Sequence, residues 1–188
     1  MPSAIDFMAR LFSYTNVGLA VSFLAFLLCL ILSKKNLTNI IQLKKQEWKY
    51  EINSQKKWIK SKIRNDDMHI LLKLNNKIIG YTMLRILKNN SFLKYKRIIY
   101  FDTHIIEKRF RGKKIASYLM EEAIKQIKKK KILAVLRCKK ELEKYYKNYK
   151  WKVVNKYIKF NDDKKLTSMV YPGSKFKKKD FVNFNLVV

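Results

Sequence analysis

One short stretch of the chain combines the residue types that bind phosphate. In residues 105–120 an apolar segment ends, the loop RFRGKK follows, and a segment with helical periodicity begins. A helix that starts after such a loop leaves backbone N–H groups free, and these groups and the positive end of the helix dipole attract anions. Gly112 permits a close approach to the backbone, and Arg111 and Lys113 offer charge-assisted hydrogen bonds. The stretch therefore predicts an anion site, with a solvated basic turn as the alternative.

The segments on both sides of this loop predict the elements that must position it. Three β-branched and apolar stretches before the loop predict strands at residues 69–74, 77–87 and 97–106. Apolar residues then recur every three or four positions between residues 115 and 127, which predicts an amphipathic helix. The remaining predicted elements are a strand at 132–136, a helix at 139–149, and strands at 151–160 and 166–171. This order predicts an α/β fold with a mixed, partly antiparallel sheet flanked by helices.

The N-terminal part of the chain reads differently. Residues 11–33 carry no charged side chain. As a helix this stretch would rise about 35 Å at about 1.5 Å per residue, enough to cross a bilayer core of about 30 Å. We therefore predict one transmembrane helix, with a cleaved signal peptide or a buried core helix as alternatives. Residues 34–67 are basic and predict one or two helices, in which Trp48 and Trp58 either anchor at the membrane interface or pack on the domain core.

The charge of the chain limits its partners and its topology. The formal net charge is +29, and the excess of Lys and Arg follows the apolar segment. This asymmetry predicts a single-pass membrane protein with its C-terminal domain on the cytosolic or mitochondrial-matrix side. An anionic lipid surface, a nucleic acid or a protein complex would offset the charge, although a coding bias toward Lys, Asn and Ile also explains it. Cys29 and Cys138 have no metal-ligand spacing, so the sequence predicts neither a zinc site nor a disulfide scaffold.

Several motifs together resemble the GNAT superfamily of N-acetyltransferases. The family signature Q/R-x-x-G-x-G/A corresponds to RGKKIA in this chain, where Arg111 and Ala116 match the outer positions and Lys114 replaces the inner glycine. The segment KIIGY at residues 77–81 resembles the family strand G-x-I-V-G-F, and YYKNYKW at residues 145–151 resembles F-Y-E-K-L-G-F. With this resemblance the chain divides into an N-terminal tail (1–10), a transmembrane helix (11–33), a basic helical segment (34–67), a GNAT-like domain (68–173) and a C-terminal tail (174–188).

The resemblance implies that acetyl-coenzyme A is the cofactor. In the family the end of the strand before the signature binds the pantetheine arm, the signature loop binds the diphosphate, and an Asn seven residues before a conserved Tyr contacts the cofactor. The Asn position is Lys139 in this chain. The cofactor-binding residues predicted in this way are His104, Ile105, Ile106, Arg111, Gly112, Lys113, Lys114, Ile115, Ala116 and Lys139.

The same resemblance implies the catalytic residues. Tyr146 corresponds to the family tyrosine that protonates the departing thiolate, and a phenol is a suitable general acid. A base is needed to take a proton from an amine. Strand alternation places Asp102 and His104 on one face of the third strand, so we predict that either one fills this role, directly or through water. The alternatives are a packed strand histidine, a core tyrosine and deprotonation by bulk water.

Two functions follow from this reading. The first is a membrane-anchored N-acetyltransferase that moves an acetyl group from acetyl-coenzyme A to a primary amine. The second is a catalytically degenerate GNAT-like structural subunit of a membrane-associated, mitochondrial or RNA-containing assembly, because Lys114, Lys139 and Lys150 replace residues that the family prefers. A plain nucleic-acid-binding module has no supporting motif in the sequence.

Overall fold

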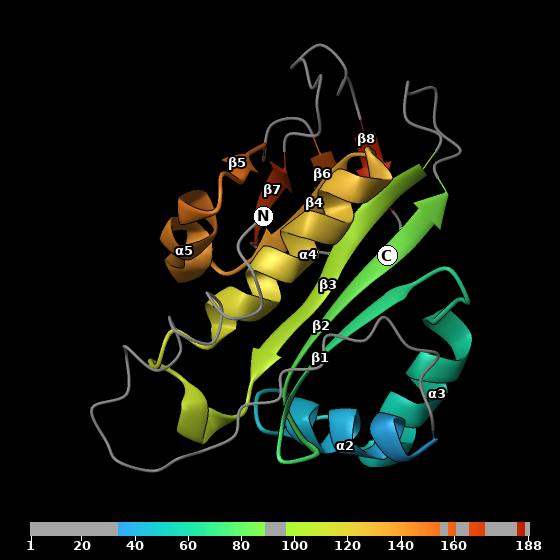
Figure 1. Cartoon of the computed structure of the whole chain (residues 1–188). Coiled ribbons are helices and arrows are strands. Elements are labelled where there is room, and N and C mark those ends of the chain that lie inside the picture. Colours follow the sequence, from blue (N-terminus) through green and yellow to red (C-terminus); the bar gives the residue numbers. More distant parts are fainter. Residues whose placement is uncertain (1–33, 89–96, 155–157, 161–165, 172–183, 187–188) are drawn as a thin grey trace.

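The computed structural model of the chain describes residues 34–88, 97–154, 158–160, 166–171 and 184–186. A six-stranded mixed sheet in the order β1-β2-β3-β4-β7-β5 forms its centre, with α2 and α3 on one face and α4 on the other (Figure 1). The helices are α2 (Lys34–Lys45), α3 (Ile52–Lys62), α4 (Ala116–Lys130) and α5 (Glu143–Asn148). The strands of this sheet are β1 (Met68–Leu74), β2 (Lys77–Lys88), β3 (Arg97–Ile106), β4 (Ala134–Cys138), β5 (Lys152–Val153) and β7 (Thr167–Tyr171).

The first three strands form an antiparallel meander, as predicted. β1 and β2 are joined by Asn75 and Asn76, whose φ angles of 46° and 63° suit a tight hairpin turn. β3 then pairs with β4 in parallel, but only from Ile99↔Ala134 to Phe101↔Leu136. Past this point β3 continues to Ile106 with no β4 partner among the described residues, so the two strands part at the centre of the sheet.

Helix α4 closes one face of the sheet. Its buried side is the apolar stripe predicted from the sequence: Leu119, Met120, Ala123 and Ile127. The helix approaches β2 closely at Gly80, where a Cβ would lie 2.6 Å from Ile106 Cδ1 and 2.9 Å from Leu119 Cδ1. The missing side chain at Gly80 therefore lets the helix and the end of β3 pack against β2.

Helices α2 and α3 cover the other face. Ile40 and Leu43 of α2 are buried against Tyr81 and Ile105 of the sheet. Trp48 and Trp58 pack against this second core. Of the two roles considered for these tryptophans, the structure thus shows packing on the domain core.

The C-terminal elements differ from the prediction. The expected helix at 139–149 is a 3₁₀ turn, Lys140–Leu142, followed by the shorter α5. The single strand expected at 151–160 is two strands: β5 joins the main sheet, while β6 (Ile158–Phe160) pairs in parallel with β8 (Phe184–Leu186) in a separate two-stranded sheet. The partner of β6 lies in the tail that the sequence pattern did not place, and such long-range pairing leaves no trace in local periodicity.

The predicted membrane anchor, residues 11–33, lies outside the described residues. In the part of the chain that the structure describes, no helix has the length and apolar character needed to cross a membrane. The anchor stays a prediction from the sequence.

Candidate cofactor and catalytic site

The loop between β3 and α4 has a backbone conformation in which several N–H groups can face an anion. Gly112 and Lys114 adopt left-handed conformations, with φ of 76° and 57°. Helix α4 begins at Ala116, and its N-cap residue Ile115 makes no capping hydrogen bond through its side chain. The N–H groups of Gly112, Lys113, Ile115 and Ala116 donate to no acceptor within residues 34–88 and 97–154. These four N–H groups, without an acceptor in the described ranges, lie at the positive end of a helix, where an anion would be favoured.

Lys114 keeps the shape that glycine would give this loop. Its left-handed backbone is unusual for a residue with a side chain, and the side chain itself is exposed. Its carbonyl accepts hydrogen bonds from the Ser117 N–H (3.0 Å) and hydroxyl (2.6 Å), which fix the first turn of α4. Lys150, at the other family glycine position, is also left-handed, with φ of 66°. Both lysines thus adopt the left-handed backbone that glycine favours, and each adds a positive charge.

Arg111 ties the loop to the rest of the domain. Its Nε donates to the Ile106 carbonyl over 3.1 Å, and one terminal nitrogen lies 2.9 Å from a carboxylate oxygen of Glu47, in the α2–α3 connection. The guanidinium therefore connects the loop to the end of β3 and to the α2–α3 connection. The sequence predicted Arg111 as a cofactor contact but gave no signal for Glu47.

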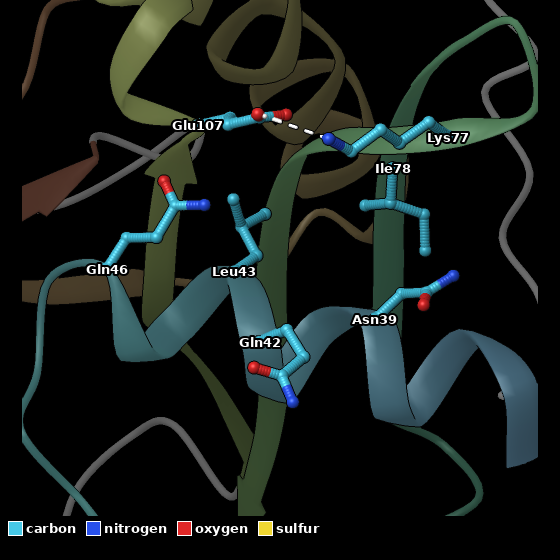
Figure 2. A pocket seen from close by; sticks show the side chains of 7 residues that line it. All are labelled: Asn39, Gln42, Leu43, Gln46, Lys77, Ile78 and Glu107. Atoms are coloured by element: carbon cyan, nitrogen blue, oxygen red, sulfur yellow. Dashed lines mark hydrogen bonds and ion pairs between the residues drawn. The ribbon is translucent and has the colours of Figure 1, made fainter.

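A shallow cavity of about 190 Å³ lies near the same strand end, on the α2 face (Figure 2). Glu107 lies at the rim of the cavity, and its Oε1 forms ion pairs with Lys77 Nζ at 3.3 Å and with Arg109 Nε at 2.9 Å. The Lys108 N–H donates to the Gln46 side chain over 3.0 Å. The cavity is lined by Asn39, Gln42, Leu43, Gln46, Lys77, Ile78 and Glu107. These contacts fix the start of the loop from the face opposite α4.

The predicted shared face of Asp102 and His104 is wrong. The β2–β3 register runs from Met83↔Thr103 directly to Leu84↔Phe101, so Asp102 is an extra residue in a β-bulge and alternation is interrupted there. Asp102 accepts a hydrogen bond from Arg85 Nη1 over 3.1 Å, and the Arg85 guanidinium lies 5.5 Å from the ring centroid of Trp58. Asp102 thus belongs to the α2–α3 side.

His104 lies on the other side, in a chain of hydrogen bonds. Its Nδ1 is 2.8 Å from Thr82 Oγ1, and its Nε2 is 3.0 Å from the Tyr145 hydroxyl. Tyr145 is hydrogen-bonded to Tyr149, which in turn bonds Ser117 in the first turn of α4. These hydrogen bonds join β2, β3, α5 and the first turn of α4. The sequence did not predict Thr82 and Tyr145 as site residues. The only signal for Tyr145 was its spacing from Tyr149, which places both on one face of a helix.

Burial of the two histidines predicts loss of stability in acid. Desolvation lowers the pKa of both His69 and His104 from 6.5 to about 4. Because the unfolded chain takes up these protons at higher pH than the folded chain, the stabilisation is complete above about pH 6.5 and is lost as the pH falls toward about 4. The free energy of unfolding is expected to drop by roughly 2–3 kcal/mol per histidine across this range.

Denaturant unfolding at several pH values between about 7 and 4 measures this slope. Burial raises the pKa of Asp67, so that carboxyl opposes the trend at lower pH. Replacing His69 by asparagine should flatten the slope relative to the unchanged chain. Identical slopes in the two proteins would show that the buried histidine does not contribute.

Tyr146 lies where β3 and β4 separate. Its ring is buried edge-on to Phe101, with centroids 6.1 Å apart, and to Trp151 at 6.3 Å. Burial, and then proximity to Cys138 and Tyr100, raises the pKa of the Tyr146 phenol well above its ordinary value. Its hydroxyl makes no hydrogen bond to another described residue. Tyr146 is therefore a protonated donor at the strand separation.

The structure brings most of the predicted residues together but leaves two apart. His104, Ile106, Tyr146, Ile115 and Ala116 lie on the α4 side of the sheet, and Arg111 ties the loop to the end of β3. Asp102 lies on the opposite side of the sheet, as described above. Lys139 is exposed directly after β4, where its carbonyl accepts the Leu142 N–H over 3.0 Å. Ile105 contributes its side chain to the α2–α3 core.

Solved structures share this fold at low sequence identity. PaiA N-acetyltransferase from Thermoplasma acidophilum, in complex with coenzyme A, is 20% identical over 74% of this chain and 94% of its own, with a TM-score of 0.50. Arabidopsis thaliana Naa50, in complex with the bisubstrate analogue CoA-Ac-MVNAL, is 18% identical over 74% and 93%, with a TM-score of 0.52. A histone acetyltransferase HPA2-related protein from Corynebacterium glutamicum is 12% identical over 78% and 96%, with a TM-score of 0.60.

The sequence itself matches a family profile. Comparison with curated protein sequences gives no match. The profile of the acetyltransferase (GNAT) family matches residues 36–150, a stretch that includes α2, α3, the β3–α4 loop and α5. The chain therefore belongs to the acetyltransferase (GNAT) family.

Proposed function

We propose that this protein is a membrane-anchored N-acetyltransferase that uses acetyl-coenzyme A and a primary amine. One observation carries the proposal: the N–H groups of Gly112, Lys113, Ile115 and Ala116 have no acceptor within residues 34–88 and 97–154, and they follow the stretch of β3 that has no β4 partner there. An unpaired strand edge next to an anion cradle suits a ligand with a diphosphate at one end and amide groups along its arm. The coenzyme A complexes of PaiA and Naa50, which share the fold, support this choice.

The residues present fit this cofactor. The N–H groups of the loop would bind its phosphates, and the exposed cations of Lys113 and Lys114 would add charge without closing the cradle. The edge of β3 along His104, Ile105 and Ile106 that faces away from β2 has no β4 partner among the described residues and would pair with the arm of the cofactor. The Ile106 carbonyl on this stretch already accepts from Arg111 Nε. The cofactor supplies an acetyl group activated as a thioester, so the protein has to position it and manage protons.

Tyr146 is our candidate for the general acid. Like any tyrosine the phenol keeps its proton at neutral pH, and it holds that proton at Oη, at the separation of β3 and β4. No other described residue competes for that proton. A positioned donor of this kind contributes about 100-fold or more to a rate.

His104 is the better of the two predicted bases. It lies on the same side of the sheet as Tyr146, since both rings pack against Phe101. Its lowered pKa leaves the imidazole neutral. Both ring nitrogens are hydrogen-bonded, so the imidazole would have to give up its bond to Tyr145 or to Thr82 before it accepts a proton from the amine. Asp102 is held by Arg85 on the other side.

The membrane anchor rests on the sequence. The uncharged residues 11–33 end directly before Lys34, where α2 begins. A span there would hold the domain at the surface of one membrane, on the cytosolic or mitochondrial-matrix side. With this anchor, the enzyme could reach an amine acceptor that lies at or in the same membrane.

Replacing Tyr146 by phenylalanine tests the proposed chemistry. We expect release of the free coenzyme A thiol, with a panel of primary amines and the purified full chain, to slow by about 100-fold or more at unchanged cofactor affinity. Tyr171→Phe is the matched control, because Tyr171 is buried at 6% exposure in the same aromatic cluster and should keep the activity.

Two results would change the assignment. Equal turnover in the Tyr146→Phe variant and the unchanged chain would remove Tyr146 from the mechanism. Cofactor binding without any thiol release, for every amine tried, would favour the degenerate structural subunit instead.

A further inference from the structure

We infer that the face formed by α2 and α3 rests on an anionic lipid bilayer, with α4 turned toward the solution. This inference builds on the proposed anchor and names the side of the domain that meets the membrane. The docking face is defined by the exposed residues of the two helices and their connection: Lys45, Lys49, Tyr50, Lys56, Lys57 and Lys60.

The first support is the distribution of charge. Helices α2 and α3 contain eight lysines and no acidic residue, as their sequences KKNLTNIIQLKK and INSQKKWIKSK show. Helices α4 and α5, ASYLMEEAIKQIKKK and EKYYKN, carry three glutamates among their lysines. Two acids lie in the α2–α3 connection: Glu47 is paired with Arg111 at 2.9 Å, and Glu51 is exposed. The docking face is thus the more purely cationic of the two helical layers.

The second support is the packing of the two helices. Their apolar sides pack against the sheet, where Ile40, Leu43 and Ile59 are buried. Lys44 is also turned inward, 4.8 Å from the centroid of Trp58. The lysines of the docking face are therefore left on the outside, without an acidic partner on their own helices. Their mutual repulsion favours a negatively charged surface against them.

The third support is the position of the face relative to the chain. The uncharged residues 11–33 are followed immediately by α2 at Lys34. A cluster of about 4–8 basic residues directly beyond a membrane span suits the anionic lipids of that leaflet. Tyr50, with 48% of its surface exposed, is an aromatic of the kind found at headgroup level. An RNA partner has no comparable tether in the chain, so lipid is the favoured occupant.

The arrangement has a consequence for the proposed enzyme. Helix α4 lies over the opposite face of the sheet from α2 and α3 (Figure 1). The Gly112 loop leads into α4 and borders the α2–α3 connection through the pair of Arg111 and Glu47. With the docking face on the bilayer, a soluble cofactor reaches the start of α4 from the aqueous side.

Lysine footprinting of the full chain tests the orientation. The protein is placed in nanodiscs of phosphatidylcholine, with or without phosphatidylserine, and its lysines are labelled with an amine-reactive ester and quantified by mass spectrometry. We expect labelling of Lys56, Lys57 and Lys60 to fall about fivefold or more with phosphatidylserine, and to recover in high salt. Labelling of Lys128, Lys129 and Lys130 on α4 should change less than about twofold.

Two triple variants provide the matched control. Lys56→Glu/Lys57→Glu/Lys60→Glu and Lys128→Glu/Lys129→Glu/Lys130→Glu change the net charge equally. Only the α3 variant should lose the phosphatidylserine-dependent protection of Lys45 and Lys49. Three results would overturn the inference. The first is an equal loss of protection in both variants, and the second is protection of the α4 lysines instead. The third is protection by added RNA in neutral discs but not by phosphatidylserine. Loss of the unchanged chain from neutral discs in high salt would instead refute the anchor.

Discussion

Replacing Asp102 by alanine is expected to destabilise the domain by about 3–5 kcal/mol. The carboxylate lies 3.1 Å from Arg85 Nη1, and the two side chains are only 13% and 5% exposed. Without Asp102, the guanidinium would stay buried beside Trp58 without its ion-pair partner, and its Nε already has no hydrogen-bond partner among the described residues. Urea unfolding of the variant and the unchanged chain gives the difference.

An exposed pair of the same residue types is the control. Asp66 lies 2.8 Å from Arg97, and their side chains are 48% and 53% exposed. Asp66→Ala should therefore cost less than about 1 kcal/mol. Similar losses in the two variants would mean that the bulge at Asp102 does not bury a structural ion pair, and would reopen a catalytic role for that carboxylate.

Replacing Gly112 by valine is expected to weaken acetyl-coenzyme A binding by about 10- to 30-fold. At φ of 76° a β-branched residue is strained, although no atom lies within 4 Å of the added Cβ. The penalty of about 1–2 kcal/mol or more acts through the backbone, because the loop relaxes to another conformation and its N–H groups no longer converge. Isothermal titration with the purified full chain measures the change.

Lys131→Val controls for backbone strain alone. Lys131 caps the far end of α4 with φ of 54°, so valine meets a comparable strain there, remote from the loop. This variant should lose stability while binding the cofactor normally. If both variants bind as the unchanged chain does, the loop is not the phosphate site.

Local patterns predicted the elements that the chain builds from neighbouring residues. The strands ending at Leu74 and Ile106 follow from their apolar and β-branched runs, and the buried stripe of α4 follows from helical periodicity. The bulge at Asp102 could not be predicted this way, since it is defined by pairing with Met83 and Leu84 on another strand. The division of residues 151–160 into two strands depends on partners in β7 and β8.

The candidate site was predictable in sequence position but not in geometry. Lys114 and Lys150 read as departures from the family's glycines, yet both keep a left-handed backbone. The sequence could not show that Arg111 would turn back onto the strand end. The hydrogen bonds from His104 to Thr82 and Tyr145 join residues far apart in the chain, and only the folded arrangement of β2, β3 and α5 brings them together.

Thermal unfolding of the full chain with and without acetyl-coenzyme A tests the central claim most directly. A ligand that binds only the folded state at about 100 times its dissociation constant stabilises it by about 2.7 kcal/mol, which for a domain of this size raises Tm by about 5–10 °C. We predict such a rise, and its loss in Gly112→Val at the same concentration. An unchanged Tm at millimolar acetyl-coenzyme A would contradict the account.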